Sequence, residues 1–147
     1  MNKFKIVVLI LVQLCVSCSK KNEIESMFVT SKNEYWKYQD YCWNNKGVYF
    51  KCNKNGSSDK YRFNTDEGFL LFNTDGDLEI IGSSWSIKND STFVFDNEEY
   101  KIEKISNKEI LLSYYHYKIK DKKCFVKLTK WVDGPKGPKP LDSAKVK

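Results

Sequence analysis

The segment SWSIKNDSTFVFDNEEYKIEKISNKEILLSYYHYK, residues 84–118, decides the fold class, because apolar and polar residues alternate along it in short runs. Trp85 and Ile87 fall on one side of a predicted strand, and the polar residues next to them fall on the other. The runs are separated by residues such as Asn89–Asp90 and Asn107–Lys108, and Asn and Asp tolerate the positive φ angles of tight turns. The segment therefore predicts consecutive antiparallel hairpins.

The same pattern continues on both sides of this segment, from residue 34 to residue 132. Aromatic residues make up 15% of the chain, which favours strands, and no stretch has the length and period of a substantial helix. We expect about eight to ten short strands. An open sheet of that size leaves unpaired edges, so the sequence predicts an all-β fold, a single up-and-down antiparallel β-barrel over residues 34–132.

Closure of the barrel brings the first strand beside the last. Setting Tyr35 opposite Trp131 in antiparallel register places Cys42 opposite Cys124, where a disulfide would join the two strands. A bond between Cys42 and Cys52 closes a much shorter segment, and this proximity gives it a slight preference. Both pairings stay open, and either one leaves a thiol.

The N-terminus has the features of a secretory signal. A short basic segment precedes the apolar run Ile6–Val16, which at eleven residues is too short to span a bilayer as a helix. Small Ser17 then precedes Cys18, in an arrangement that resembles the lipoprotein box of bacteria. We expect residues 1–17 to be a signal peptide and Cys18 to be the lipidated first residue. An ordinary cleaved signal and a short membrane anchor are the alternatives.

The segments that flank the predicted barrel lack a pattern for a core. Residues 18–33 are polar and predict a tether, and residues 133–147, rich in Pro, Gly and Lys, predict a flexible tail. A lipid on Cys18 would make the membrane a partner of the protein. We expect a Gram-negative cell envelope, and Ser19 rather than Asp after the cysteine favours the periplasmic face of the outer membrane.

Charge and composition point away from nucleic acid and from catalysis. Removing residues 1–17 lowers the formal net charge from +6 to +4, and Arg62 is the only arginine, so no basic face for nucleic acid is expected. With His116 as the only histidine, a His-rich metal site is impossible. Residues 73–84 start like a calcium loop but lack its Gly at position six and its Glu at position twelve. We predict a protein that is not an enzyme, without cofactor, metal or catalytic residues.

Residues 69–114 resemble the lipocalin-like domains of small bacterial lipoproteins. The shared motifs are a strand ending in Phe-Asn-x-Asp-Gly, a Gly-x-x-Trp-Ser strand, a Tyr-Lys-Ile strand and an apolar strand ending in Leu-x-Tyr. They are matched by Phe72, Asn73, Asp75, Gly76, Gly82, Trp85, Ser86, Tyr100, Lys101, Ile102, Leu112 and Tyr114. The resemblance implies a small up-and-down barrel in a lipoprotein and implies little about its ligand.

The aromatic residues raise two functional hypotheses. Trp85, Phe93, Phe95 and Tyr100 are predicted to face the barrel interior, where they would line a site for a small hydrophobic ligand, unless the protein is only an envelope scaffold. The alternative is a protein-binding inhibitor, including a toxin-immunity lipoprotein, with an exposed aromatic patch near Tyr114–Tyr117.

Overall fold

The computed structural model of the protein describes residues 23–43, 45–72, 74–75, 78–79, 83–134 and 137–141. Within these ranges the chain forms twelve strands and one short helix, residues 23–28. The strands are β1 (Glu34–Asp40), β2 (Asn45–Cys52), β3 (Ser57–Asn64), β4 (Gly68–Leu71), β5 (Thr74–Asp75), β6 (Leu78–Glu79), β7 (Ser83–Asn89), β8 (Thr92–Phe95), β9 (Glu98–Ile105), β10 (Glu109–Tyr115), β11 (Lys123–Val132) and β12 (Lys139–Pro140).

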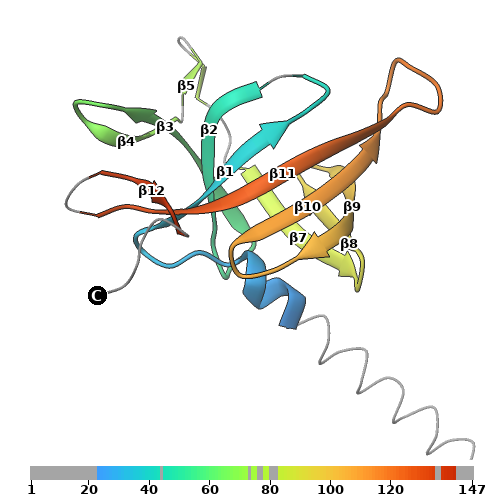
Figure 1. Ribbon diagram of the computed structural model, residues 1–147, viewed down its shortest axis with the longest axis horizontal. Coiled ribbons are helices and arrows are strands. Elements are labelled where there is room, and N and C mark those ends of the chain that lie inside the picture. Colours follow the sequence, from blue (N-terminus) through green and yellow to red (C-terminus); the bar gives the residue numbers. More distant parts are fainter. Residues whose placement is uncertain are drawn as a thin grey trace, which may run out of the picture.

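Eight strands form a ring of antiparallel neighbours (Figure 1). Their order is β1-β2-β3-β7-β8-β9-β10-β11, and β11 pairs again with β1. β4 pairs with β3, β12 pairs with β11, and β5 and β6 form a separate two-stranded sheet. The prediction of an all-β chain built from short antiparallel strands is confirmed.

The turns between neighbouring strands contain Asn and Asp, the residue types that the sequence suggested. β8 and β9 are joined by Asp96 and Asn97, which both have positive φ angles of 50° and 69°. Two central residues with positive φ give a hairpin turn whose twist matches that of the strands. The shortest pairing in the ring is that of β3 with β7, which consists of two residue pairs.

The ring closes in the register expected from the sequence. Tyr35 of β1 lies opposite Trp131 of β11, and the pairing continues to Asp40 opposite Val126. Just beyond it, Cys42 and Cys124 form a disulfide with a Cα–Cα distance of 5.7 Å. The bond joins the first and last strands of the ring at one end.

The preferred pairing of Cys42 with Cys52 is wrong, and the register of the β1–β2 hairpin gives the reason. Phe50 lies opposite Trp36, so Cys52 lies at the start of β1, whereas Cys42 follows its end. About eight residues of extended chain, at about 3.3 Å each, separate the two positions, far more than a disulfide can span. Cys52 is a buried free thiol.

The second half of the predicted tether, residues 18–33, belongs to the fold. The helix of residues 23–28 closes one end of the ring and lies at the bottom of Figure 1. Its Ile24 and Phe28 are buried, and the Phe28 ring stacks on Phe93 at a centroid distance of 4.3 Å. The spacing of four residues places both apolar side chains on one face of the helix, toward the ring interior. Residues 18–22 lie outside the described residues.

The core is the interior of the ring at its helix end. The alternation predicted for the strands is confirmed there, since Trp85, Ile87, Phe93, Val126 and Leu128 are buried while their neighbours in sequence are more exposed. The full cluster of buried residues is Ile24, Phe28, Trp36, Phe50, Cys52, Trp85, Ile87, Phe93, Ile110, Leu112, Val126 and Leu128.

A second aromatic cluster covers the outer face of β1 and β2. Phe69 of β4 stacks on Tyr35 at 3.8 Å and meets Tyr49 edge-on at 4.9 Å. The ammonium of Lys37 lies 4.7 Å from the ring centroid of Trp131, within the range of a cation–π contact. The strands at the point of closure are therefore packed on both faces.

The predicted tail, residues 133–147, also begins within the fold. β12 pairs with the end of β11, with Pro140 opposite Trp131 and Lys139 opposite Val132. Residues 142–147 lie outside the described residues. Within the described ranges, no helix has the length and apolar character needed to cross a bilayer.

Candidate functional site

A pocket of about 430 Å³ opens into the ring at the end opposite the helix. Inward-facing side chains of β1, β2, β8 and β9 form its wall, and residues of β3 and of the β8–β9 turn form its rim. The lining residues are Tyr38, Val48, Phe50, Lys60, Tyr61, Arg62, Phe72, Phe95, Asp96, Glu98 and Tyr100. Most of this surface is aromatic or aliphatic, which suits an apolar molecule.

Phe50 separates this pocket from the core. It is 2% exposed, its ring lies 5.1 Å from that of Phe95, and it belongs to both the core cluster and the pocket wall. The pocket is therefore a continuation of the ring interior, and the bulky residues of the helix end form its floor.

A buried carboxylate lies beside the inner wall of the pocket. Asp40, 3% exposed, accepts hydrogen bonds through Oδ2 from the hydroxyls of Tyr114 (2.8 Å) and Tyr38 (3.3 Å). Through Oδ1 it accepts from the backbone N–H groups of Cys42 (2.7 Å) and Trp43 (3.2 Å). Four donors satisfy the charge, so the burial of this acid is compensated. Asp40 also links the pocket wall to the turn that carries the disulfide.

The tyrosines of the inner wall are held in their protonated form. Burial raises the pKa of Tyr38 well above its usual range, and the neighbouring Tyr100 and Asp40 add to this. Burial, followed by the hydrogen bond to Asp40, raises the pKa of Tyr114 in the same direction. Burial also raises the pKa of Tyr100, a pocket residue. Because Tyr38 and Tyr114 donate to Asp40, the hydroxyl that the pocket offers to a ligand is that of Tyr100.

The rim of the pocket carries charge of both signs. Lys60 pairs with Asp96 at 2.8 Å, and Glu98 adds a second carboxylate on the rim. The guanidinium of Arg62 lies 3.8 Å from the centroid of Phe72, over the ring face. Because the Lys60–Asp96 pair is partly exposed, we expect it to orient the rim more than to stabilise the fold.

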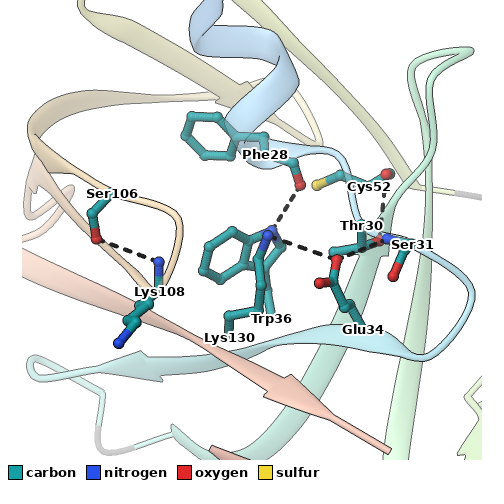
Figure 2. A network of polar contacts seen from close by, with 9 residues as sticks. All are labelled: Phe28, Thr30, Ser31, Glu34, Trp36, Cys52, Ser106, Lys108 and Lys130. Atoms are coloured by element: carbon teal, nitrogen blue, oxygen red, sulfur yellow. Dashed lines mark hydrogen bonds and ion pairs between the residues drawn. The ribbon is translucent and has the colours of Figure 1, made fainter. Parts of the chain in front are cut away.

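At the helix end of the ring, polar contacts join the helix and the segment after it to the strands (Figure 2). The indole Nε1 of Trp36 donates to the carbonyl oxygen of Phe28 at 2.7 Å, which ties the end of the helix to β1. The ammonium of Lys130, 7% exposed as a residue, lies 4.7 Å from the Trp36 ring centroid and 3.8 Å from the Glu34 carboxylate. The indole of Trp36 and the carboxylate of Glu34 together compensate the burial of the Lys130 ammonium.

The four residues predicted to line a ligand site divide between the two ends. Phe95 and Tyr100 line the pocket. Trp85 and Phe93 instead belong to the core, where Phe28 lies 6.1 Å from Trp85 and 4.3 Å from Phe93 between ring centroids. The helix, which the sequence prediction missed, occupies the space that these two residues were expected to leave for a ligand.

Sequence reasoning missed Tyr38, Asp40 and Tyr114 as site residues. The alternation of β1 could have indicated these residues. Trp36, Tyr38 and Asp40 are every second residue of the strand and therefore share its inner face. An acid at an inward position among aromatic residues predicts buried hydrogen-bond donors around it.

The remaining sequence predictions for site chemistry concern metals and the lipid. Among the residues that the structure describes, no cluster of His, Cys, Asp or Glu could hold a metal ion. The calcium-loop motif lies partly outside the described residues, and Cys18 lies entirely outside them. His116 lies in the β10–β11 loop, where its Nδ1 accepts from the backbone N–H groups of Lys118 and Ile119.

A second exposed feature, here called the loop patch, surrounds the disulfide. It consists of residues on the β1–β2 turn, the end of β10, the β10–β11 loop and the start of β11, namely Tyr41, Trp43, Tyr115, His116, Tyr117, Ile119 and Phe125. The rings of Trp43, His116 and Tyr117 lie within 18° of parallel, with centroids 5.1 to 5.8 Å apart. The alternative of a protein-binding inhibitor predicts an exposed aromatic patch near Tyr114–Tyr117; Tyr114 itself points inward to Asp40.

Comparison with known proteins gives no relative from which a function could be taken. No family model matches this chain, and neither a curated protein nor a solved structure matches it. The pocket and the loop patch are therefore the features of the chain that bear on its function.

Proposed function

We propose that this protein is a lipid-anchored lipoprotein of the cell envelope whose lipocalin-like barrel binds a small, mostly apolar ligand without catalysis. The observation that carries the proposal is the pocket of about 430 Å³, which lies within the size range of small-molecule sites. The ring of antiparallel strands, with the helix at one end and the pocket at the other, supports the barrel description.

The pocket wall indicates the chemistry of the ligand. An apolar body would contact Phe50, Phe72 and Phe95, and burial of its surface would supply most of the affinity. The hydroxyl of Tyr100 lies in the pocket wall and would donate to one acceptor on the ligand. A molecule of this kind has few polar groups and one or two hydrogen-bond acceptors.

Binding of the neutral fluorescent probe N-phenyl-1-naphthylamine tests the pocket directly. We expect a saturable rise in fluorescence with the wild-type protein. Val48→Trp fills the pocket from β2 and should weaken binding by about tenfold or more, which corresponds to about 1.4 kcal/mol.

The matched control is Val94→Trp, on the other face of β8 from Phe93 and Phe95. It should leave probe binding unchanged. Equal binding by the two variants would overturn the ligand proposal and favour a scaffold. Native mass spectrometry of protein from its own host would then identify the natural ligand in the wild type and its loss in Val48→Trp.

The lipid anchor at Cys18 is part of the same proposal and has its own test. It is supported by the short apolar run and the small residue before the cysteine. We expect the wild-type protein to fractionate with membranes and Cys18→Ser to lose acylation. Mass spectrometry that finds an unmodified Cys18 in mature protein from its host would overturn the anchor and leave the pocket unaffected.

A protein-binding inhibitor, including a toxin-immunity lipoprotein, is the second candidate. It is favoured by the exposed rings of the loop patch, since aromatic residues are enriched at protein interfaces. It ranks second because the cations beside these rings are all lysines, which are depleted at such interfaces.

A further inference from the structure

We propose that the loop patch docks onto the surface of a bilayer that contains anionic lipid. This surface lies outside the pocket, so the inference is independent of the ligand proposal. The starting observation is a group of apolar side chains that the described part of the structure leaves exposed. The exposed fractions of Tyr41, Trp43, Tyr115, Tyr117, Ile119 and Phe125 range from 37% to 72%.

The patch is held in a fixed shape before it meets anything. The Cys42–Cys124 disulfide joins its two segments, and the backbone N–H of Tyr41 donates to the carbonyl oxygen of Phe125 at 3.0 Å. Asp40 accepts from the N–H of Trp43, and His116 Nδ1 caps the turn that follows it. A preorganised surface loses little conformational entropy on docking.

The charge around the patch identifies the occupant. The β10–β11 loop and the first residue of β11 carry Lys118, Lys120, Lys122 and Lys123 against a single acid, Asp121. Lys123 is paired with Glu103 at 2.7 Å, whereas Lys118, Lys120 and Lys122 are exposed. A surface of this sign is complementary to anionic headgroups, which attract each nearby lysine by about 1 kcal/mol.

The combination of side chains favours lipid over protein. Trp and Tyr prefer the boundary between headgroups and acyl chains, where the ring is buried and its polar atom stays hydrated. In the run Tyr117-Lys118-Ile119-Lys120, apolar residues alternate with lysines whose long stems can lie along acyl chains with the ammonium in the headgroups. A protein interface would be expected to carry arginine instead.

The position of the patch gives the orientation of the docked molecule. The helix and the patch lie at opposite ends of β1 (Figure 1), about 20 Å apart for seven residues of strand. Contact with lipid at the patch and, under the proposed anchor, at Cys18 as well would lay the ring lengthwise along the bilayer.

Vesicle binding tests the proposal with the chain from residue 18 onward carrying Cys18→Ser, so that no acyl chain contributes. All described elements lie between residues 23 and 141, so this chain retains them. We expect binding to phosphatidylcholine vesicles that contain phosphatidylglycerol, little binding to phosphatidylcholine alone, and weakening by added salt. Replacing Lys118, Lys120 and Lys122 by Gln should weaken binding by about 100-fold.

The matched control replaces Lys32, Lys54 and Lys104, three exposed lysines outside the loop patch, by Gln and removes the same charge. It should bind almost as the wild type does. Trp43→Ser with Tyr117→Ser should weaken binding at constant charge, and thermal unfolding checks that each variant is folded. Equal losses in the two lysine variants, or equal binding to neutral and anionic vesicles, would falsify the proposal. Absence of vesicle binding together with a salt-sensitive complex between these residues and an envelope protein would assign the patch to that protein instead.

Discussion

The two ends of the ring interior differ in what fills them. At the helix end the protein fills the interior itself, because Phe28 packs against both Trp85 and Phe93 in a cluster of buried residues. At the other end Tyr38 and Tyr100 border a pocket of about 430 Å³, and their hydroxyls lie near a buried acid. The strands present inward side chains at both ends, so the covering segment makes the difference. The pocket end is where the proposed ligand would bind.

The largest effect is expected from emptying the helix end. Phe28→Ala removes a ring that is 0% exposed and leaves a cavity in close-packed surroundings, so we expect a loss of about 4 kcal/mol in the free energy of unfolding. Chemical denaturation measures this loss. The control Phe63→Ala, at an exposed position, should cost less than about 1 kcal/mol.

The thiol of Cys52 reports locally on the same end. Burial raises its pKa, and so it should resist alkylation in the wild type and react faster in Phe28→Ala. If Phe28→Ala were as stable as the wild type and its thiol remained protected, the helix would not be part of the core.

Removing the disulfide tests the pocket end, again through the free energy of unfolding. The Cys42–Cys124 bond spans 82 residues, and a double replacement by Ala should cost about 3 kcal/mol. Because the bond lies at the far end of β1 from Cys52, the thiol should stay protected at concentrations of denaturant below the transition. Early alkylation of Cys52 in this variant would show that the two ends open together.

Asp40→Asn disturbs the pocket end without removing a covalent bond. The amide places an NH₂ group where the carboxylate oxygen accepted from two hydroxyls. The hydroxyl of Tyr38 or that of Tyr114 therefore loses its acceptor. We expect a loss of about 2 kcal/mol in unfolding free energy and weaker probe binding in the pocket. Unchanged stability would mean that the carboxylate is not needed to hold the inner wall.

Tyr100→Phe should separate ligand binding from stability. The hydroxyl lies in the pocket wall, so its removal should change the unfolding free energy by less than about 1 kcal/mol. A ligand with an acceptor should bind about fivefold more weakly, and the apolar probe should bind equally well. A loss of affinity for the apolar probe would point to a change in the shape of the pocket.

The smallest effect concerns neither end but an acid on the outer face of β9. Hydrogen bonds from Lys123 and Ser113 lower the pKa of Glu103 from 4.5 to about 2. A lowered pKa contributes stability that is present above pH 4.5 and is lost as the pH falls toward 2. We expect this part of the acid-induced loss to be missing in Glu103→Gln. A curve of unfolding free energy against pH that does not change with this substitution would contradict the prediction.

The strands of the ring could be predicted because their signals are local. Alternation placed Trp85, Ile87 and Val126 on the inner face, and Asn and Asp marked the turns. The closure of β1 on β11 followed from the requirement to pair both edges, and its register was correct at Tyr35 and Trp131.

The helix and the pocket could not be predicted in the same way. A helix of six residues with one apolar pair, Ile24 and Phe28, gives no periodic signal, and its stability comes from tertiary packing. Without it, Trp85 and Phe93 seemed to line a cavity. The preference for a Cys42–Cys52 bond rests on proximity in sequence, whereas the register of β1 and β2 separates these two cysteines.

The free thiol of Cys52 has a consequence for the order of events during biogenesis. Synthesis proceeds from the N-terminus, so Cys42 and Cys52 coexist in the growing chain before Cys124 has been made. The short loop between them closes at less entropic cost than the native one of 82 residues. Only pairing of β1 with β2 holds the two sulfurs at opposite ends of a hairpin. An oxidant that acts before this hairpin has formed would trap a covalent isomer in which β1 cannot pair with β2.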